Sequence, residues 1–353
     1  MAARTNVVQL LDSVLVSSGG KPLAILSAFE CLAEWMRAKL IGAIDIAPPS
    51  RLATAAFKVL HARGMDPTPI PSLSSSPSPS TPKPSPFSRL AAMDGVMHAA
   101  RQLAEAVVER VSDEAIVHLR RSVAPGGSAA AGDAPAPDDF RGPEGLLRVL
   151  VNDVVLCADV AERCHARGDE QGNWVMARVV SLAADACGRV LMRPHGVHYG
   201  GLLAALVRCT GCGDADAAEC CVHAWGEVSR TVLGRAAAGF EDDSDNDEDE
   251  DFEDGELGPG DGDSGHGEGK DKVTGEDSPI APRLPPPVQT MVKRAYHELV
   301  TVVLSAIEFP AGFEDQPDDL QNQFRMDWRY KVCALLEDAC SVCGTVAVAG
   351  RLM

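Results

Sequence analysis

Apolar residues recur at steps of three and four along most of the chain, and the clearest case lies between Asp318 and Gly344. One stripe there is formed by Phe324, Trp328, Val332, Leu335, Ala339 and Val342. This spacing predicts an amphipathic helix. Such a helix needs a neighbour to cover its stripe, and the segment Val288–Ile307 has the same periodicity. We therefore expect these two segments to pair.

The same spacing predicts about ten helices in the whole chain. Their expected bounds are Thr5–Ser17, Pro22–Ile41, Arg51–Arg63, Arg89–Arg110, Asp113–Ser122, Gly145–Arg167, Asn173–Val190, Tyr199–Cys209, Asp214–Arg235 and Val288–Ile307, followed by the helix through Phe324. Ser112 is a plausible N-cap of the fifth helix. No sustained alternation of apolar and polar residues indicates a strand. The predicted fold class is all-α.

Three low-complexity stretches divide the helices into blocks, and their composition predicts disorder because they carry too little apolar surface to offset the entropy of ordering. The expected organisation is helical repeats at 1–64, a Pro/Ser-rich loop at 65–88, a helical repeat at 89–122, an Ala/Gly/Pro-rich loop at 123–143, helical repeats at 144–239, an acidic insertion at 240–287, a helical repeat at 288–346 and a truncated end at 347–353.

Helices joined in twos by short polar breaks, with a period near 40 residues, are typical of HEAT and armadillo arrays. We therefore expect an α-α superhelix, a solenoid of antiparallel helix pairs with long disordered insertions. The large residues expected in its core are Phe29, Trp35, Trp225, Phe324, Trp328 and Leu335.

The net charge of -19 comes mostly from one segment. Residues 240–281 hold eighteen Asp and Glu against two Lys, so the rest of the chain is nearly neutral. This removes the case for a nucleic-acid-binding surface built from bulk charge. There is no leader pattern and no apolar run of about 18 residues, so neither secretion nor a membrane partner is supported. The eleven cysteines fit reduced core residues.

Candidate catalytic chemistry is sparse, and we expect no enzyme and no cofactor. Cysteines and one histidine at Cys209, Cys212, Cys220, Cys221 and His223 leave a zinc site open as a minor alternative to core packing. The CxxC pair at Cys340 and Cys343 lies within a helical stripe, where core packing is again the simpler interpretation.

The acidic run is the one stretch whose charge suggests a binding role. Its twelve carboxylates, which would attract Lys/Arg-rich partners with strong salt dependence, are Glu241, Asp242, Asp243, Asp245, Asp247, Glu248, Asp249, Glu250, Asp251, Glu253, Asp254 and Glu256. The alternative is a solvated insertion that keeps the chain soluble.

Four segments in order resemble the middle portion of karyopherin-β (importin-β superfamily) nuclear transport receptors, in the branch that contains transportin-SR (transportin-3) and importin-13. They are a Cys-Leu-x-x-Trp helix at Ala28–Gly42, paired helices at Trp174–Leu191 and Leu202–Val232, and a Phe-Arg-led segment at Phe324–Gly344. The chain departs from that family in its three long insertions and in its length, which fits a fragment or a truncated gene model.

The resemblance implies a nuclear import receptor that shuttles between nucleus and cytoplasm. It implies protein cargo such as Ser/Arg-rich splicing factors or other basic nuclear proteins, release through Ran GTPase, and contact with nucleoporins by the full-length receptor. The alternative is an acidic helical scaffold or chaperone that binds basic nuclear proteins such as histones through residues 241–256.

Overall fold

The computed structural model describes residues 8–14, 21–46, 51–65, 86–123, 143–188, 194–233, 284–307, 317–323 and 329–352. Predictions for the acidic run, for Phe324 and Trp328, and for all but the ends of the three low-complexity stretches lie outside these residues. Within them the regular structure is helical and no strand occurs, so the all-α fold class is confirmed for this part of the chain.

The helices follow one another along the chain with short or undescribed connections. They are α2 (Pro22–Arg37), α3 (Arg51–Arg63), α4 (Pro86–Ala91), α5 (Asp94–Val123), α6 (Pro143–His165), α7 (Glu170–Gly188), α8 (Gly200–Thr210), α9 (Ala215–Val232), α10 (Pro286–Ile307), α11 (Asp318–Gln323), α12 (Arg329–Cys343) and α13 (Thr345–Leu352), with 3-10 turns at Ala43–Ile46 and Pro194–Tyr199. Residues 8–14 are also helical. No helix in the described ranges is both long and apolar enough to cross a bilayer.

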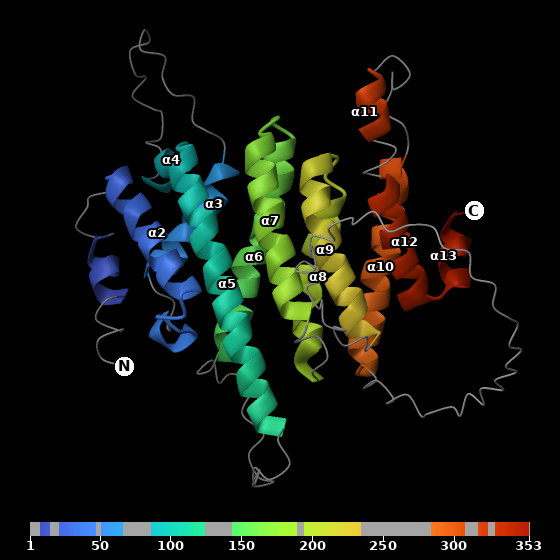
Figure 1. Ribbon diagram of the computed structural model, residues 1–353, viewed down its shortest axis with the longest axis horizontal. Helices are drawn as coiled ribbons and strands as arrows, with labels where there is room; N and C mark the ends of the chain where they lie inside the picture. Colours follow the sequence, from blue (N-terminus) through green and yellow to red (C-terminus); the bar gives the residue numbers. More distant parts are fainter. Residues whose placement is uncertain are drawn as a thin grey trace, which may run out of the picture.

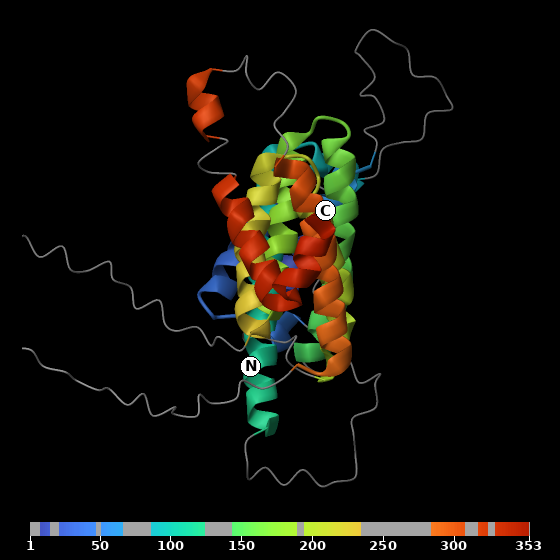
Figure 2. The same ribbon diagram turned by 90° about the vertical axis from the view of Figure 1, so that its right-hand side faces the viewer.

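The long helices lie side by side in chain order, as Figure 1 shows. They form two layers, because each helix other than the six-residue α4 and α11 packs against the next but one of the remaining helices. Layer A consists of α2, α5, α7, α9 and α12, in which each helix contacts its successor. Layer B consists of α3, α6, α8, α10 and α13, which contact one another in the same sequence. Turned by 90°, the molecule shows α9 and α12 on one side and α10 on the other (Figure 2).

Helix boundaries follow from capping chemistry. Asp214 is the N-cap of α9, where its carboxylate accepts hydrogen bonds from the backbone N–H groups of Asp216 and Ala217. Gly168, Gly213 and Gly344 each follow a helix and have φ of 70°, 83° and 93°. This left-handed conformation favours glycine, so these residues end α6, α8 and α12 and turn the chain into the next helix.

Two predicted boundaries, the N-cap at Ser112 and the helix end at Ile41, are wrong. Ser112 is not an N-cap: α5 runs unbroken for 30 residues and buries Ser112 in its interior, because apolar neighbours such as Val111 and Ala115 continue its stripe. The helix expected at Pro22–Ile41 ends at Arg37, where the chain turns through Lys39 at φ 59°. The part of the expected helix at Phe324 and Trp328 lies outside the described residues, and α12 is described from Arg329. The helix α13 follows Gly344, where the sequence predicted no helix.

The core is continuous between the layers. Phe29, Trp225 and Leu335 are buried, and Trp35 is partly exposed and packs against the edge of this core. Trp225 occupies the junction of α8, α9 and α10: its Nε1 donates to Thr210 Oγ1 at 3.1 Å, and its carbonyl accepts from the Tyr296 hydroxyl at 2.9 Å. The two rings meet edge to face at 5.0 Å. This contact fixes α9 against α10 on either side of the long connection between them.

Candidate interaction site

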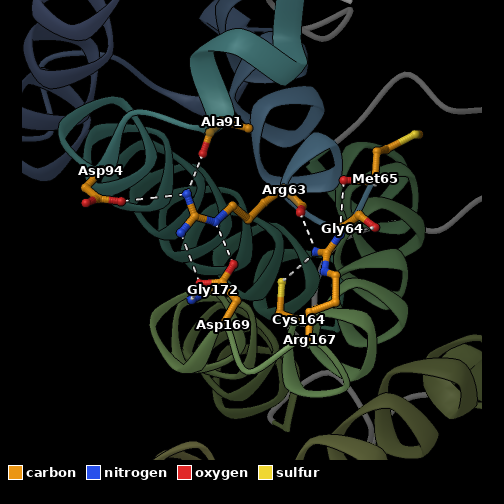
Figure 3. Close-up of polar contacts among 9 residues, drawn as sticks. All are labelled: Arg63, Gly64, Met65, Ala91, Asp94, Cys164, Arg167, Asp169 and Gly172. Atoms are coloured by element: carbon orange, nitrogen blue, oxygen red, sulfur yellow. Dashed lines mark hydrogen bonds and ion pairs between the residues drawn. The ribbon is translucent and has the colours of Figure 1, made fainter. Parts of the chain in front are cut away.

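Arg63 lies at the last turn of α3 and joins three parts of the array at one edge. Its Nε and Nη2 donate to the two carboxylate oxygens of Asp169 at 2.7 and 3.0 Å. Its Nη1 donates to the Ala91 carbonyl at 2.8 Å and lies 3.7 Å from Asp94. Figure 3 shows the guanidinium between the ends of α4 and α5 on one side and the turn from α6 to α7 on the other. The planar, five-donor guanidinium suits this task because it can bind several acceptors at once.

Asp169 is held by both its partner and its position before α7. Besides Arg63, its Oδ1 accepts the backbone N–H of Gly172 at 3.1 Å, as an N-cap does. The hydrogen bonds from Arg63 are the main cause that lowers the pKa of Asp169, and the N–H of Gly172 acts in the same direction. The same ion pair raises the pKa of Arg63. The carboxylate is therefore ionised at neutral pH and fixes the α6–α7 turn to α3.

Arg167 lies in the same α6–α7 turn and caps the C-terminal end of α3. Its Nη2 donates to the Arg63 carbonyl at 2.7 Å, and its Nη1 donates to the carbonyls of Gly64 and Met65 at 3.4 and 3.1 Å. These carbonyls belong to the C-terminal end of α3, whose dipole favours a cation. A fourth contact reaches the Cys164 sulfur at 3.7 Å. We call Arg63, Arg167 and Asp169 together the arginine clamp.

Two hollows flank the arginine clamp. The larger, of about 290 Å³, is lined by Ala62, Arg63, Met65, Ala91, Ala92, Arg167 and Asp169. The smaller, of about 60 Å³, lies toward Trp174, His98 and Asp94. Over Trp174 the guanidinium of Arg101 stacks at 5.3 Å from the ring centre. These hollows combine apolar walls with charged side chains, which can contact the side chains of a bound partner.

A second feature lies on layer A: the carboxylate of Glu109 on α5, whose negative charge is only partly balanced by neighbouring cations. Burial raises the pKa of Glu109, and repulsion from Glu105 adds to the rise, while Arg37 and Arg178 oppose it. Glu105 itself is paired with Arg101 at 2.8 Å. The ionised form of Glu109 is therefore less favourable than that of a free carboxylate, and a further cation nearby would stabilise it.

Charge also divides the two layers. In layer A, α2, α5, α7 and α9 each hold more Asp and Glu than Lys and Arg, and α12 holds two of each kind. In layer B, α3, α8, α10 and α13 hold more Lys and Arg, and α6 is the exception. Layer A thus offers the more acidic face. The acidic run Glu241–Glu256, the sequence's own candidate for binding basic partners, lies outside the described residues.

The cysteines considered for zinc do not converge on a described metal site. Cys209 and Cys221 are buried, and burial raises the pKa of both thiols. Cys221 donates to the Ala217 carbonyl, and Cys212 accepts from the Asn173 amide at 3.4 Å. Among the described residues no group of three or more His, Cys, Asp or Glu has the arrangement of a metal site. Cys343 donates to the Lys293 carbonyl, in a helix-packing contact with α10.

The arginine clamp was not anticipated from the sequence, yet one signal marked its turn. Cys-x-x-x-Gly-Asp occurs at Cys164–Asp169 and again 45 residues later at Cys209–Asp214. Each copy ends a layer B helix with a left-handed glycine and begins a layer A helix with an aspartate. In the second copy Asp214 Oδ2 accepts from the Asn173 side chain of α7 at 2.9 Å. Both aspartates therefore tie their turn to the preceding hairpin.

Compared with models of protein families, with curated proteins and with solved structures, the chain gives no match.

Proposed function

We propose that the protein is a non-enzymatic helical scaffold of the α-α superhelix type, HEAT- or armadillo-like, that binds a basic segment of a partner protein on layer A. The observation that carries the proposal is the packing order, in which every long helix contacts the next but one. Such an order places the helices of each layer side by side, and stacked helical repeats use the surfaces so formed for protein partners.

The charge of layer A supports a basic partner. Glu109 lies near two arginines that are themselves engaged with other carboxylates: Arg37 pairs with Glu34, and Arg178 lies 3.9 Å from Glu105. A Lys or Arg of a partner would supply the missing counter-charge at Glu109, with an affinity that falls as salt rises.

The more specific form of the proposal is a segment of a nuclear import receptor. Its support is the resemblance of the four segments to the karyopherin-β family, together with their location, in the same order, in α2, α7, α8–α9 and α12 of one packed series of helices. In that form the partner is cargo such as a Ser/Arg-rich protein, and Ran GTPase releases it. The full-length receptor contacts nucleoporins and shuttles between nucleus and cytoplasm.

A binding experiment distinguishes a basic partner bound on layer A from one bound by the acidic run. A fluorescein-labelled peptide of alternating Arg and Ser is titrated with the full chain and with a variant lacking residues 240–283, each across a salt series. Retained binding by the deletion variant supports the layer A surface. Complete loss would assign basic-partner binding to the acidic run and favour the acidic chaperone.

Ran provides the second arm. GTP-loaded Ran is expected to weaken peptide binding if the chain releases cargo as an import receptor does. Peptide binding that is the same with GTP-loaded and GDP-loaded Ran would remove support for the import form and leave the scaffold proposal standing.

A further inference from the structure

The larger hollow beside the arginine clamp has an apolar part and a charged part. Ala62 from α3, Ala91 from α4 and Ala92 from the α4–α5 junction supply small apolar side chains, and Met65 stands at the edge with 63% of its surface exposed. Methionine adapts its shape to different contacts because it is unbranched and polarizable. The volume of about 290 Å³ is at or below the lower end of pockets that hold whole small molecules, roughly 300–1,000 Å³. It suits one bulky side chain of a peptide.

The charged part of the hollow is cationic. Arg63 is neutralised by its two-point pair with Asp169. Arg167 is different, because the contacts of its guanidinium are with neutral acceptors: the carbonyls of Arg63, Gly64 and Met65 and the sulfur of Cys164. Its charge is shared with the end of α3 but is paired with no carboxylate in the described part of the chain. A carboxylate beside the hollow would therefore be attracted to Arg167.

We propose that this hollow binds a short acidic segment of a partner protein that carries one bulky apolar side chain between carboxylates. The apolar side chain enters among Ala62, Ala91, Ala92 and Met65, and an adjacent carboxylate pairs with Arg167. The site is separate from the acidic face of layer A, which takes the opposite charge, so either proposal can fail without the other.

The test uses the full chain and, because the chain itself carries Asp-Phe-Glu-Asp at 251–254, also the variant lacking residues 240–283. The ligand is the fluorescein-labelled peptide Gly-Ser-Asp-Phe-Glu-Asp-Gly-Ser, with a second peptide in which Ser replaces Phe. Binding to the first peptide is expected to be about tenfold tighter, since the Phe side chain is the part that becomes buried. Equal binding of the two peptides by both proteins, or no binding of the first peptide by either protein, would overturn the proposal.

Two variants locate the binding. Ala92→Trp fills the hollow from an exposed position and is expected to weaken binding about tenfold, whereas Ala204→Trp, at an exposed position of α8 away from the hollow, is expected to leave it unchanged. Arg167→Gln is expected to reduce the salt dependence of binding as well as the affinity. Melting temperatures check that each variant folds. Folded Ala92→Trp that binds as tightly as the wild type would place the peptide elsewhere and refute the site.

Discussion

Arg63 and Asp169 meet through two parallel hydrogen bonds, Nε to Oδ2 at 2.7 Å and Nη2 to Oδ1 at 3.0 Å, although 106 positions separate them in the chain. Both side chains are about four-fifths buried, so water screens the pair only partly. The pair joins the end of α3 to the turn before α7, and it makes the α6–α7 hairpin dependent on α3. Its contribution can be measured.

Asp169→Asn is expected to lower the free energy of unfolding by about 2 kcal/mol at pH 7, because it removes charge-assisted hydrogen bonds from Arg63. The pKa of Asp169 is lowered in the folded protein, so its stabilisation is present above the unfolded-state pKa of about 4 and is lost as pH falls through the lower folded value. Urea unfolding between pH 7 and pH 3 measures both effects. The difference in unfolding free energy between Asp169→Asn and the wild type should become smaller as the pH falls toward 3.

The matched control is Asp216→Asn, which removes a carboxylate from an exposed position in the first turn of α9. A change within about 0.5 kcal/mol is expected. If both variants lost the same stability, the effect would be one of net charge and not of the arginine clamp.

Tyr296→Phe is expected to lower the free energy of unfolding by about 1 kcal/mol, because the buried hydroxyl donates to the Trp225 carbonyl at 2.9 Å. The substitution keeps the shape of the ring. Tyr330→Phe, at a residue that is 77% exposed, should change nothing measurable. Thermal or urea unfolding of the two variants side by side provides the comparison. Equal stability of Tyr296→Phe and wild type would argue against the Trp225–Tyr296 contact between α9 and α10.

Two glycines should respond to alanine with opposite signs. Gly168→Ala is expected to destabilise the protein by about 1 kcal/mol, since φ is 70° there and no atom lies close enough to clash. Gly226→Ala, inside α9 with open space around the added methyl group, should stabilise it by about 0.5 to 1 kcal/mol. The sign of each change in unfolding free energy is the readout. Stabilisation by Gly168→Ala would contradict the left-handed turn.

Ser112→Ala tests whether α5 is one helix. Its hydroxyl is buried and has no hydrogen-bond partner in the described part of the chain, so removing it should be neutral or stabilising by up to about 1 kcal/mol. If Ser112 were an N-cap, the same substitution would instead lower the free energy of unfolding by about 1 kcal/mol. The unfolding free energy therefore distinguishes a continuous α5 from the two helices that the sequence suggested.

The sequence predicts the helices well where local signals agree. Arg51–Arg63 is predicted and found with the same bounds, and Asp214 lies at the start of its helix as expected. At Ser112 a local capping signal competed with the apolar stripe of a longer helix, and burial against neighbouring helices decided the outcome.

The candidate site was harder to predict because its residues come from distant positions. No local pattern reveals that Arg63 would meet Asp169 or that Arg167 would cap α3. The repeated Cys-x-x-x-Gly-Asp could have marked equivalent turns, but its partners depend on how the hairpins stack. Similarly, the charge of Glu109 becomes informative only when α2 and α7 are placed beside α5.

The most direct test of layer A as a binding surface is the affinity of Glu109→Lys for the peptide of alternating Arg and Ser, measured by fluorescence anisotropy. The matched control is Glu298→Lys, which reverses a half-exposed carboxylate on α10 of layer B. We expect Glu109→Lys to weaken binding by about tenfold and Glu298→Lys to change it by less than about twofold. Equal affinities of the two variants would contradict the assignment of the basic partner to layer A.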